Sequence, residues 1–251
     1  MIDAFADVSL AQLWLVAIVA LVASLIGGVA GYGTGALMPL ILVPMVGPEP
    51  VVPIIAISAL LTNTGRAVAF RSYIDYRRSA IVVVGAVPPC MLTAWGYTKL
   101  TSTGAMLVIG TMLMLTVPLR IFLRRRAVSL NDKGLLVGSV GYGTAVGGTV
   151  GAGVILLSIL MAAGLSGAGV VATDAAISIV IGLVRLMVFG AAGVVDGKVL
   201  AFALLIGGIA FPGAFLARAL VKRLPLRLHT AILDAVVLVG GAVMVFRALT
   251  G

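Results

Sequence analysis

Long apolar stretches constrain this chain more than any other feature. A helix needs roughly 20 apolar residues to cross the hydrocarbon core of a bilayer. Eight stretches are of that order: residues 10–30, 51–70, 79–98, 104–123, 134–150, 167–189, 199–217 and 228–248. Because their apolar residues are continuous rather than alternating with polar ones, they predict helices and not the strands of a barrel. The chain is therefore expected to be an all-α, polytopic membrane protein.

Composition excludes a soluble domain as the alternative. Of the 251 residues, 62% are hydrophobic and 10% are charged, whereas a soluble domain carries about 25% charged residues. The net charge of +9 does not indicate nucleic-acid binding, because most of the positive residues fall in short loops between the apolar stretches. Such residues set membrane topology. The expected partner is the lipid bilayer, with no nucleic acid.

The basic residues predict which loops face the cytoplasm. Three regions hold 12 of the 17 lysines and arginines: Arg71, Arg77 and Arg78; Arg120, Arg124, Arg125, Arg126 and Lys133; and Arg218, Lys222, Arg223 and Arg227. The other connections are mixed or acidic. The positive-inside rule places the three basic regions in the cytoplasm. In the plasma (inner) membrane of a cell, the N- and C-termini then both face outward.

Two further apolar stretches, 35–46 and 152–163, are too short to be ordinary spans, and each follows a cluster of glycines. An odd number of crossings must separate an outer N-terminus from the cytoplasmic loop at Arg71. The long stretches 10–30 and 51–70 give two crossings, and the short stretch 35–46 gives the third. The same holds for 152–163 in the second half. We therefore predict eight full transmembrane helices and two short or broken ones. Alternatively, each short stretch forms a hairpin of half-helices that meet inside the membrane.

The two halves of the chain resemble each other. Residues 28–33 match 148–153 at an offset of 120 positions, and Ala56-Ile57-Ser58 matches Ala176-Ile177-Ser178 at the same offset. We predict one repeat over 1–125 and a second over 126–251, within one integrated membrane domain. Since each copy has an odd number of crossings, their topologies are inverted. Inverted repeats are typical of secondary transporters, which bind substrate near the midplane where the repeats meet.

The glycine clusters predict helix breaks at equivalent places in the two repeats. Glycine permits a positive φ and close backbone approach, and non-helical backbone at membrane depth occurs where it is buried or lines a cavity. A helix resuming after the break would direct its amide groups into that cavity, which suits an anion. Alternatively, the glycines only allow helices to pack closely. The candidate binding residues here are Gly31, Gly33, Thr34, Gly35, Gly151 and Gly153.

Polar residues inside the apolar stretches are further candidates, because such residues are expensive in a membrane. Asp174 lies well inside the stretch 167–189 and could carry a coupling proton, or it could be a packed, hydrogen-bonded acid. Two sets of neutral polar residues could bind the substrate: Thr173 and Ser178 beside this acid, and Ser58, Thr62 and Asn63 in the equivalent stretch of the first repeat.

Charged residues near the ends of the apolar stretches have simpler explanations. Arg66 and Arg185 each lie four residues before the end of a stretch, on opposite sides of the membrane. Long side chains at such positions can extend to the lipid headgroups; the alternative is a gate that attracts anions at each entrance. Asp234 is expected to be an interfacial acid, and His229 is expected to have a structural role.

These motifs also resemble a known family. Gly31-Tyr32-Gly33-Thr34-Gly35-Ala36-Leu37-Met38-Pro39 is similar to the glycine-rich signature of the TauE/SafE sulfite-exporter family, and Gly151–Leu156 resembles its second copy. Thr34, Val154 and Ile155 stand where that signature prefers glycine. The resemblance covers nearly the whole chain. It implies export or uptake of sulfite, sulfonates or other small sulfur-containing or organic anions.

The sequence thus predicts a secondary transporter for a small anion, with protons as a candidate coupling ion. An anion channel and a membrane assembly protein remain alternatives. We expect no enzyme, cofactor or metal site, because one histidine and Cys90, the single cysteine, cannot supply the usual zinc ligand sets. Neither the particular anion nor the oligomeric state follows from the sequence.

Overall fold

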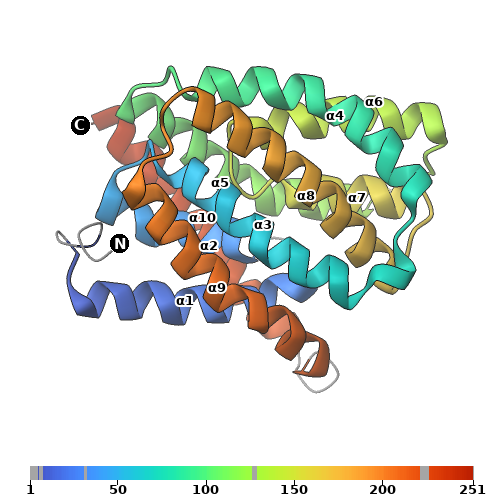
Figure 1. Ribbon diagram of the computed structural model, residues 1–251, viewed down its shortest axis with the longest axis horizontal. Helices are drawn as coiled ribbons and strands as arrows, with labels where there is room; N and C mark the ends of the chain where they lie inside the picture. The colour runs from blue at the N-terminus through green and yellow to red at the C-terminus, as the bar shows by residue number, and fades with distance from the viewer. Residues whose placement is uncertain (1–4, 6–7, 31–32, 126–128, 221–225, 251) are drawn as a thin grey trace.

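The computed structural model describes residues 5, 8–30, 33–125, 129–220 and 226–250, and all regular secondary structure in these segments is helical (Figure 1). The helices are α1 (Leu10–Ala30), α2 (Gly33–Val46), α3 (Val51–Ala69), the short 3₁₀ helix η2 (Arg71–Tyr73), α4 (Tyr76–Tyr97), α5 (Ser102–Arg125), α6 (Asp132–Gly147), α7 (Gly153–Ala162), α8 (Gly167–Ala191), α9 (Gly197–Leu220) and α10 (Leu226–Thr250). The expected all-α class is confirmed.

Polar residues at the turns explain where several helices begin. Asp75 precedes α4 and accepts a hydrogen bond from the Arg78 amide at 2.9 Å. Asn131 does the same for α6 through the Gly134 amide at 2.9 Å, and Asp196 precedes α9 and accepts from the Val199 amide at 2.7 Å. Each side chain satisfies a donor that the first helical turn leaves free. The turns therefore interrupt an otherwise continuous series of apolar helices.

Four of the described helices are long and apolar enough to cross a membrane by length and composition: α3, α4, α5 and α8. Shorter apolar segments occur within α1, α2, α7 and α9. These features support a multi-pass membrane protein. The count of eight full crossings stays a prediction.

The surface of α4 has the residue distribution of a lipid-facing helix. Tyr76 is exposed at its beginning and Trp95 near its end, with Val84 and Leu92 exposed between them. Tyrosine and tryptophan concentrate at the two interfaces of a bilayer, and aliphatic side chains face the hydrocarbon between them. This face of α4 is therefore suited to contact lipid along most of its length.

α6 and α7 form a hairpin. The amide of Leu130, just before α6, donates to the carbonyl of Ala162 at the end of α7, at 2.7 Å. The pair therefore begins and ends at the same end of the bundle. The 10 residues of α7 rise only about 15 Å, half of a hydrocarbon core of roughly 30 Å. The hairpin has the form that the sequence left open as an alternative, and its ending inside the membrane stays a prediction.

Helix packing follows a recurring pattern. α4 packs against α6 and α8, and α9 packs against α1 and α3; α3 also packs against α8, and α5 against α10. If five is added to each helix number, and counting restarts at α1 after α10, the contacts of α4 thus become those of α9. The contact of α4 with α6 is especially close: a Cβ added to Gly143 would lie 2.2 Å from the carbonyl oxygen of Ala86. Only glycine permits this backbone approach.

Candidate functional site

The beginnings of α2 and α7 meet inside the bundle. A Cβ added to Gly35, in the first turn of α2, would lie 3.2 Å from the amide nitrogen of Gly151, just before α7. Gly151 has a φ of +81°, a conformation that other residues rarely adopt. The structure thus brings the two glycine clusters together, although they are far apart in sequence. Gly31 lies outside the described residues.

This junction, residues 33–35 with 148–153, places two partial positive charges close together. The first amides of a helix lack intrahelical acceptors, and the helix dipole adds about half a positive charge at that end. The surrounding side chains of Val150, Ala152 and Val154 are buried and apolar. Electrostatic interactions are stronger in such surroundings than in water. The junction therefore presents amide donors from the beginnings of two helices in apolar surroundings.

A buried arginine lies beside the junction. The residue Arg185 of α8 is 6% exposed, and its Nη2 donates to the carbonyl oxygen of Thr149 at 3.1 Å. Its guanidinium also lies 5.8 Å from the ring centroid of Phe189. The buried Nε has no hydrogen-bond partner. Arg185 is therefore buried within the bundle, and the position near the headgroups that the sequence favoured for it stays a prediction.

No aspartate or glutamate among the residues placed by the structure forms a salt bridge with Arg185. A carbonyl oxygen carries only a partial charge, so the guanidinium keeps most of its positive charge unneutralised. Burying a charge is costly unless it is paired. Arg185 is thus a cation that a bound anion would stabilise.

Arg66, the corresponding arginine of α3, has a carboxylate partner. Its Nη2 lies 3.0 Å from Oδ2 of Asp174, and the two side chains are 13% and 5% exposed. Its Nη1 donates to Oδ1 of Asn63 at 3.1 Å. Its Nε is buried without a partner. The ion pair joins α3 to α8 and brings together three residues that the sequence assigned to separate roles.

The candidate hydroxyls are mostly engaged by backbone. Ser58 donates to the Ile55 carbonyl at 3.0 Å and Thr62 to the Ser58 carbonyl at 3.2 Å, a common arrangement within helices. Thr173 accepts from the amide of Asp75 at 3.0 Å. In this structure the protons of Ser58 and Thr62 are therefore not directed at a substrate.

Tyr142 is a residue that the sequence reasoning missed. It is 2% exposed, its hydroxyl interacts with Ser178, and it lies within electrostatic range of both Asp174 and Arg185. It thus lies within the electrostatic influence of both charged residues of α8. The available signal was a single tyrosine between Gly141 and Gly143 in an otherwise apolar, glycine-rich helix.

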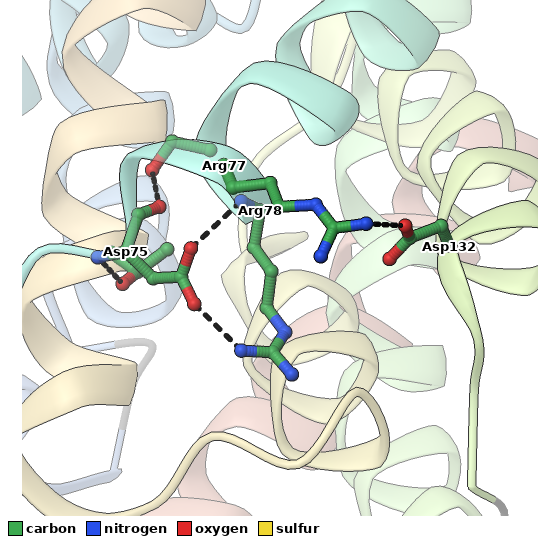
Figure 2. A network of polar contacts seen from close by, with 6 residues as sticks. Asp75, Arg77, Arg78 and Asp132 are labelled. Carbon is green, nitrogen blue, oxygen red and sulfur yellow. Dashed lines mark hydrogen bonds and ion pairs between the residues drawn. The ribbon is translucent and has the colours of Figure 1, made fainter.

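A charged network closes the end of the bundle near Asp75 (Figure 2). Asp75 accepts from the amide of Arg78 at 2.9 Å and from its Nη1 at 2.6 Å, and Arg77 pairs with Asp132. The Arg78 amide hydrogen bond is the main cause that lowers the pKa of Asp75 below its ordinary value. The network connects α4 to the beginnings of α6 and, through Thr173, α8.

Comparison with protein families matches residues 16–244 to the family described as "Sulfite exporter TauE/SafE". The chain belongs to this family. Searches of curated proteins and of solved structures returned no match. The family resemblance read from the glycine motifs is thus confirmed over nearly the whole chain. TauE/SafE membership makes the protein a member of a membrane-transporter family, with transport of sulfur-containing anions as the family-level function.

A second buried ion pair lies elsewhere in this TauE/SafE protein. Arg120 of α5 pairs with Asp234 of α10, and their side chains are 7% and 17% exposed. Asp234 is therefore largely buried against α5, and its position at the membrane interface stays a prediction. The pair connects α5 and α10, whose contact, like that of α3 with α8, is unchanged when five is added to each helix number.

Proposed function

We propose that this TauE/SafE protein is a secondary transporter that binds a small sulfur-containing anion, such as sulfite or an organosulfonate, at the glycine junction. The observation that carries the proposal is Arg185, a buried cation beside the junction whose hydrogen-bond acceptor is the Thr149 carbonyl. An anion here would neutralise the guanidinium and accept from amides at the beginnings of α2 and α7. The charge and the donors then act on the same ligand.

Energetics favour this site over the hydroxyl residues. A charged side chain at the centre of a bilayer costs several kcal/mol, on the order of 3 by insertion measurements. A bound anion would recover part of that cost as a charge-assisted hydrogen bond. Ser58 and Thr62 offer no comparable gain, because their protons already have backbone acceptors.

Movement of the anion across the membrane fits two inverted repeats, residues 1–125 and 126–251. The recurrence of helix contacts after five helices supports this division, as does the approach of Gly35 to Gly151 from equivalent places in the two halves. In such transporters, rocking of one repeat against the other exposes a midplane site to each side in turn.

Proton coupling through Asp174 is a further part of the proposal. A proton on this carboxylate would remove the negative partner of Arg66. Because this ion pair joins α3 to α8, binding of the proton would change the contact between the two helices. Replacing Asp174 with asparagine should leave anion binding at Arg185 intact but abolish accumulation driven by a pH gradient. Equal accumulation by the variant and the wild type would exclude this coupling role.

The experiment that tests the main proposal is uptake of ³⁵S-labelled sulfite into liposomes containing the purified protein, with methanesulfonate, taurine and acetate as competitors. We expect saturable uptake that sulfonates inhibit and that Arg185→Gln abolishes, while Arg185→Lys keeps a measurable rate because the charge remains. Uptake that never saturates would indicate a channel. Absence of flux in folded protein, or full activity of Arg185→Gln, would contradict the proposed site.

A further inference from the structure

The two arginines of the central helix pair are related in position but differ in their partners. Arg66 in α3 and Arg185 in α8 are 119 positions apart, close to the offset of 120 that relates Ser58 to Ser178. α3 packs against α8, and the end of α3 lies by the beginning of α8, where Arg66 meets Asp174. The two guanidiniums therefore lie toward opposite ends of an antiparallel pair.

Among the residues that the structure describes, only one of these guanidiniums has a carboxylate partner. Asp174 pairs with Arg66, whereas the positions that would serve Arg185 in the same way, 54 and 55, are the buried isoleucines Ile54 and Ile55. The difference between the two arginines therefore follows from the residue types at these positions. In the described structure the Asp174 carboxylate lies at one end of the helix pair, and no carboxylate pairs with Arg185 at the other end.

The contact of Asp174 with Arg66 leaves part of the guanidinium available. The carboxylate is held through Nη2, the neutral amide oxygen of Asn63 accepts from Nη1, and Nε has no hydrogen-bond partner. Carboxylate and sulfonate oxygens present similar acceptors to a guanidinium. A small oxyanion could therefore replace Asp174 at Nη2 and also accept from Nε, without a new arrangement of the helices.

We propose that Arg66 is a second anion-binding site, which the carboxylate of Asp174 occupies in this structure in place of the transported anion. This inference rests on the proposed function, because it assumes that an anion first binds near Arg185. Asp174 and Arg185 are 11 positions apart on α8, or about 16 Å of helix. The anion would move over that distance, displace Asp174 and later be expelled when Asp174 returns.

The displaced carboxylate needs its own compensation, because its side chain is only 5% exposed. A proton bound to the Asp174 carboxylate supplies it, so one proton and one anion would occupy this end of the helix pair together. The ionisable groups facing Asp174 are Arg66 from α3 and Tyr142 from α6. Asp75 with Arg78 lies beyond the neighbouring Thr173.

Equilibrium dialysis of the purified full-length protein against ³⁵S-labelled sulfite tests the inference through stoichiometry. Wild type should bind about one anion per chain, and Asp174→Asn about two, because the amide no longer neutralises Arg66. The matched control, Arg66→Gln with Asp174→Asn, should bind about one again. Binding of one anion by folded Asp174→Asn protein would overturn the inference.

Transport by the double variant provides a second test that does not require Asp174→Asn to fold. Two neutral side chains leave no unpaired buried charge, so this variant should be stable. It should keep the wild-type stoichiometry yet lose at least about ten-fold in sulfite uptake, a difference of roughly 1.4 kcal/mol in the rate-limiting step. Wild-type uptake by this variant would show that the pair is only structural.

The same measurements separate failure of this inference from failure of the proposed function. Arg185→Gln tests the first site alone: if it binds and transports sulfite as wild type does, the proposed function fails whatever Asp174→Asn does. If Arg185→Gln is inactive and Asp174→Asn still binds one anion, only the second site is excluded.

Discussion

At the scale of single residues, the two buried arginines should respond differently to removal of their charge. Arg66→Gln leaves Asp174 buried without its cation, which should lower the free energy of unfolding by about 3–5 kcal/mol. Arg185→Gln removes a charge that has no carboxylate partner in the described structure, so stability should stay equal or increase. Thermal unfolding of both variants in the same detergent measures the contrast. An equal loss of stability would indicate an unrecognised partner of Arg185.

Asp75 allows a prediction about pH, because it lies in a turn outside the membrane-spanning segments. Hydrogen bonds from Arg78 lower its pKa in the folded protein, so the folded state binds fewer protons than the unfolded state and stability rises with pH across that interval. The contribution of Asp75 to the free energy of unfolding is fully present above the pKa of about 3.9 that an aspartate has in the unfolded chain. It is lost as the pH falls through the lower pKa that Asp75 has in the folded protein.

Asp75→Asn keeps an N-cap acceptor but removes the negative charge that faces Arg78, so it should reduce the free energy of unfolding by up to about 1 kcal/mol at neutral pH. The difference from wild type should be constant above about pH 5 and shrink below about pH 4. Thermal unfolding of both proteins over this range provides the measurement. A difference that grows as the pH falls would contradict the assigned direction.

Some residue roles were not accessible from the sequence. Helical spacing placed Ser58, Thr62 and Arg66 on one face of a helix, but it could not give the rotation of α3 relative to α8, and so it missed the pair of Arg66 with Asp174. Residue spacing also does not predict whether a hydroxyl donates its hydrogen bond to a carbonyl of its own helix, as Ser58 and Thr62 do, or to a ligand. The glycine clusters were informative, because the absence of a Cβ lets the backbone approach its neighbours closely.

At the scale of helices, the contact between α4 and α6 depends on glycine at one position. A Cβ on Gly143 would lie 2.2 Å from the Ala86 carbonyl oxygen, whereas one on Gly141, in the same helix, would meet no atom within 4 Å. Gly143→Ala should therefore separate the two helices and destabilise the protein by a few kcal/mol. Gly141→Ala should be neutral or stabilising by up to about 1 kcal/mol, because alanine is the better helix former.

Detergent-solubilised thermal unfolding compares these two alanine variants directly. Equal melting temperatures would mean that α4 and α6 do not approach as closely as the structure has them.

Most helix positions themselves followed from the sequence: the stretch 152–163 became α7 (Gly153–Ala162), and the stretch 167–189 became α8 (Gly167–Ala191). Apolar length and flanking glycines were sufficient for that, whereas the partners of each helix depend on side-chain fit across helices.

At the scale of the whole molecule, the α6–α7 hairpin and the basic loops together make a prediction about topology. The hydrogen bond from Leu130 to Ala162 holds the two ends of the hairpin together, so Ser129 and Ser166 should lie on the same side of the membrane. α8 then crosses once, which puts Ala192 on the other side. Arg77 and Arg78 form ion pairs with Asp132 and Asp75 at the side of Ser129 and Ser166 (Figure 2). Because basic loops face the cytoplasm, this side is expected to be cytoplasmic.

Single cysteines at positions 129, 166 and 192 test this arrangement in a Cys90→Ala background, which removes a thiol that is buried. A membrane-impermeant maleimide added to intact cells should label position 192 alone, and positions 129 and 166 should become reactive only after the membrane is opened. Labelling of 129 and 166 from opposite sides would mean that α7 is part of a full crossing. In that case the beginning of α7 could not lie at mid-membrane beside Gly35, and the proposed anion site would lose one of its two helix ends.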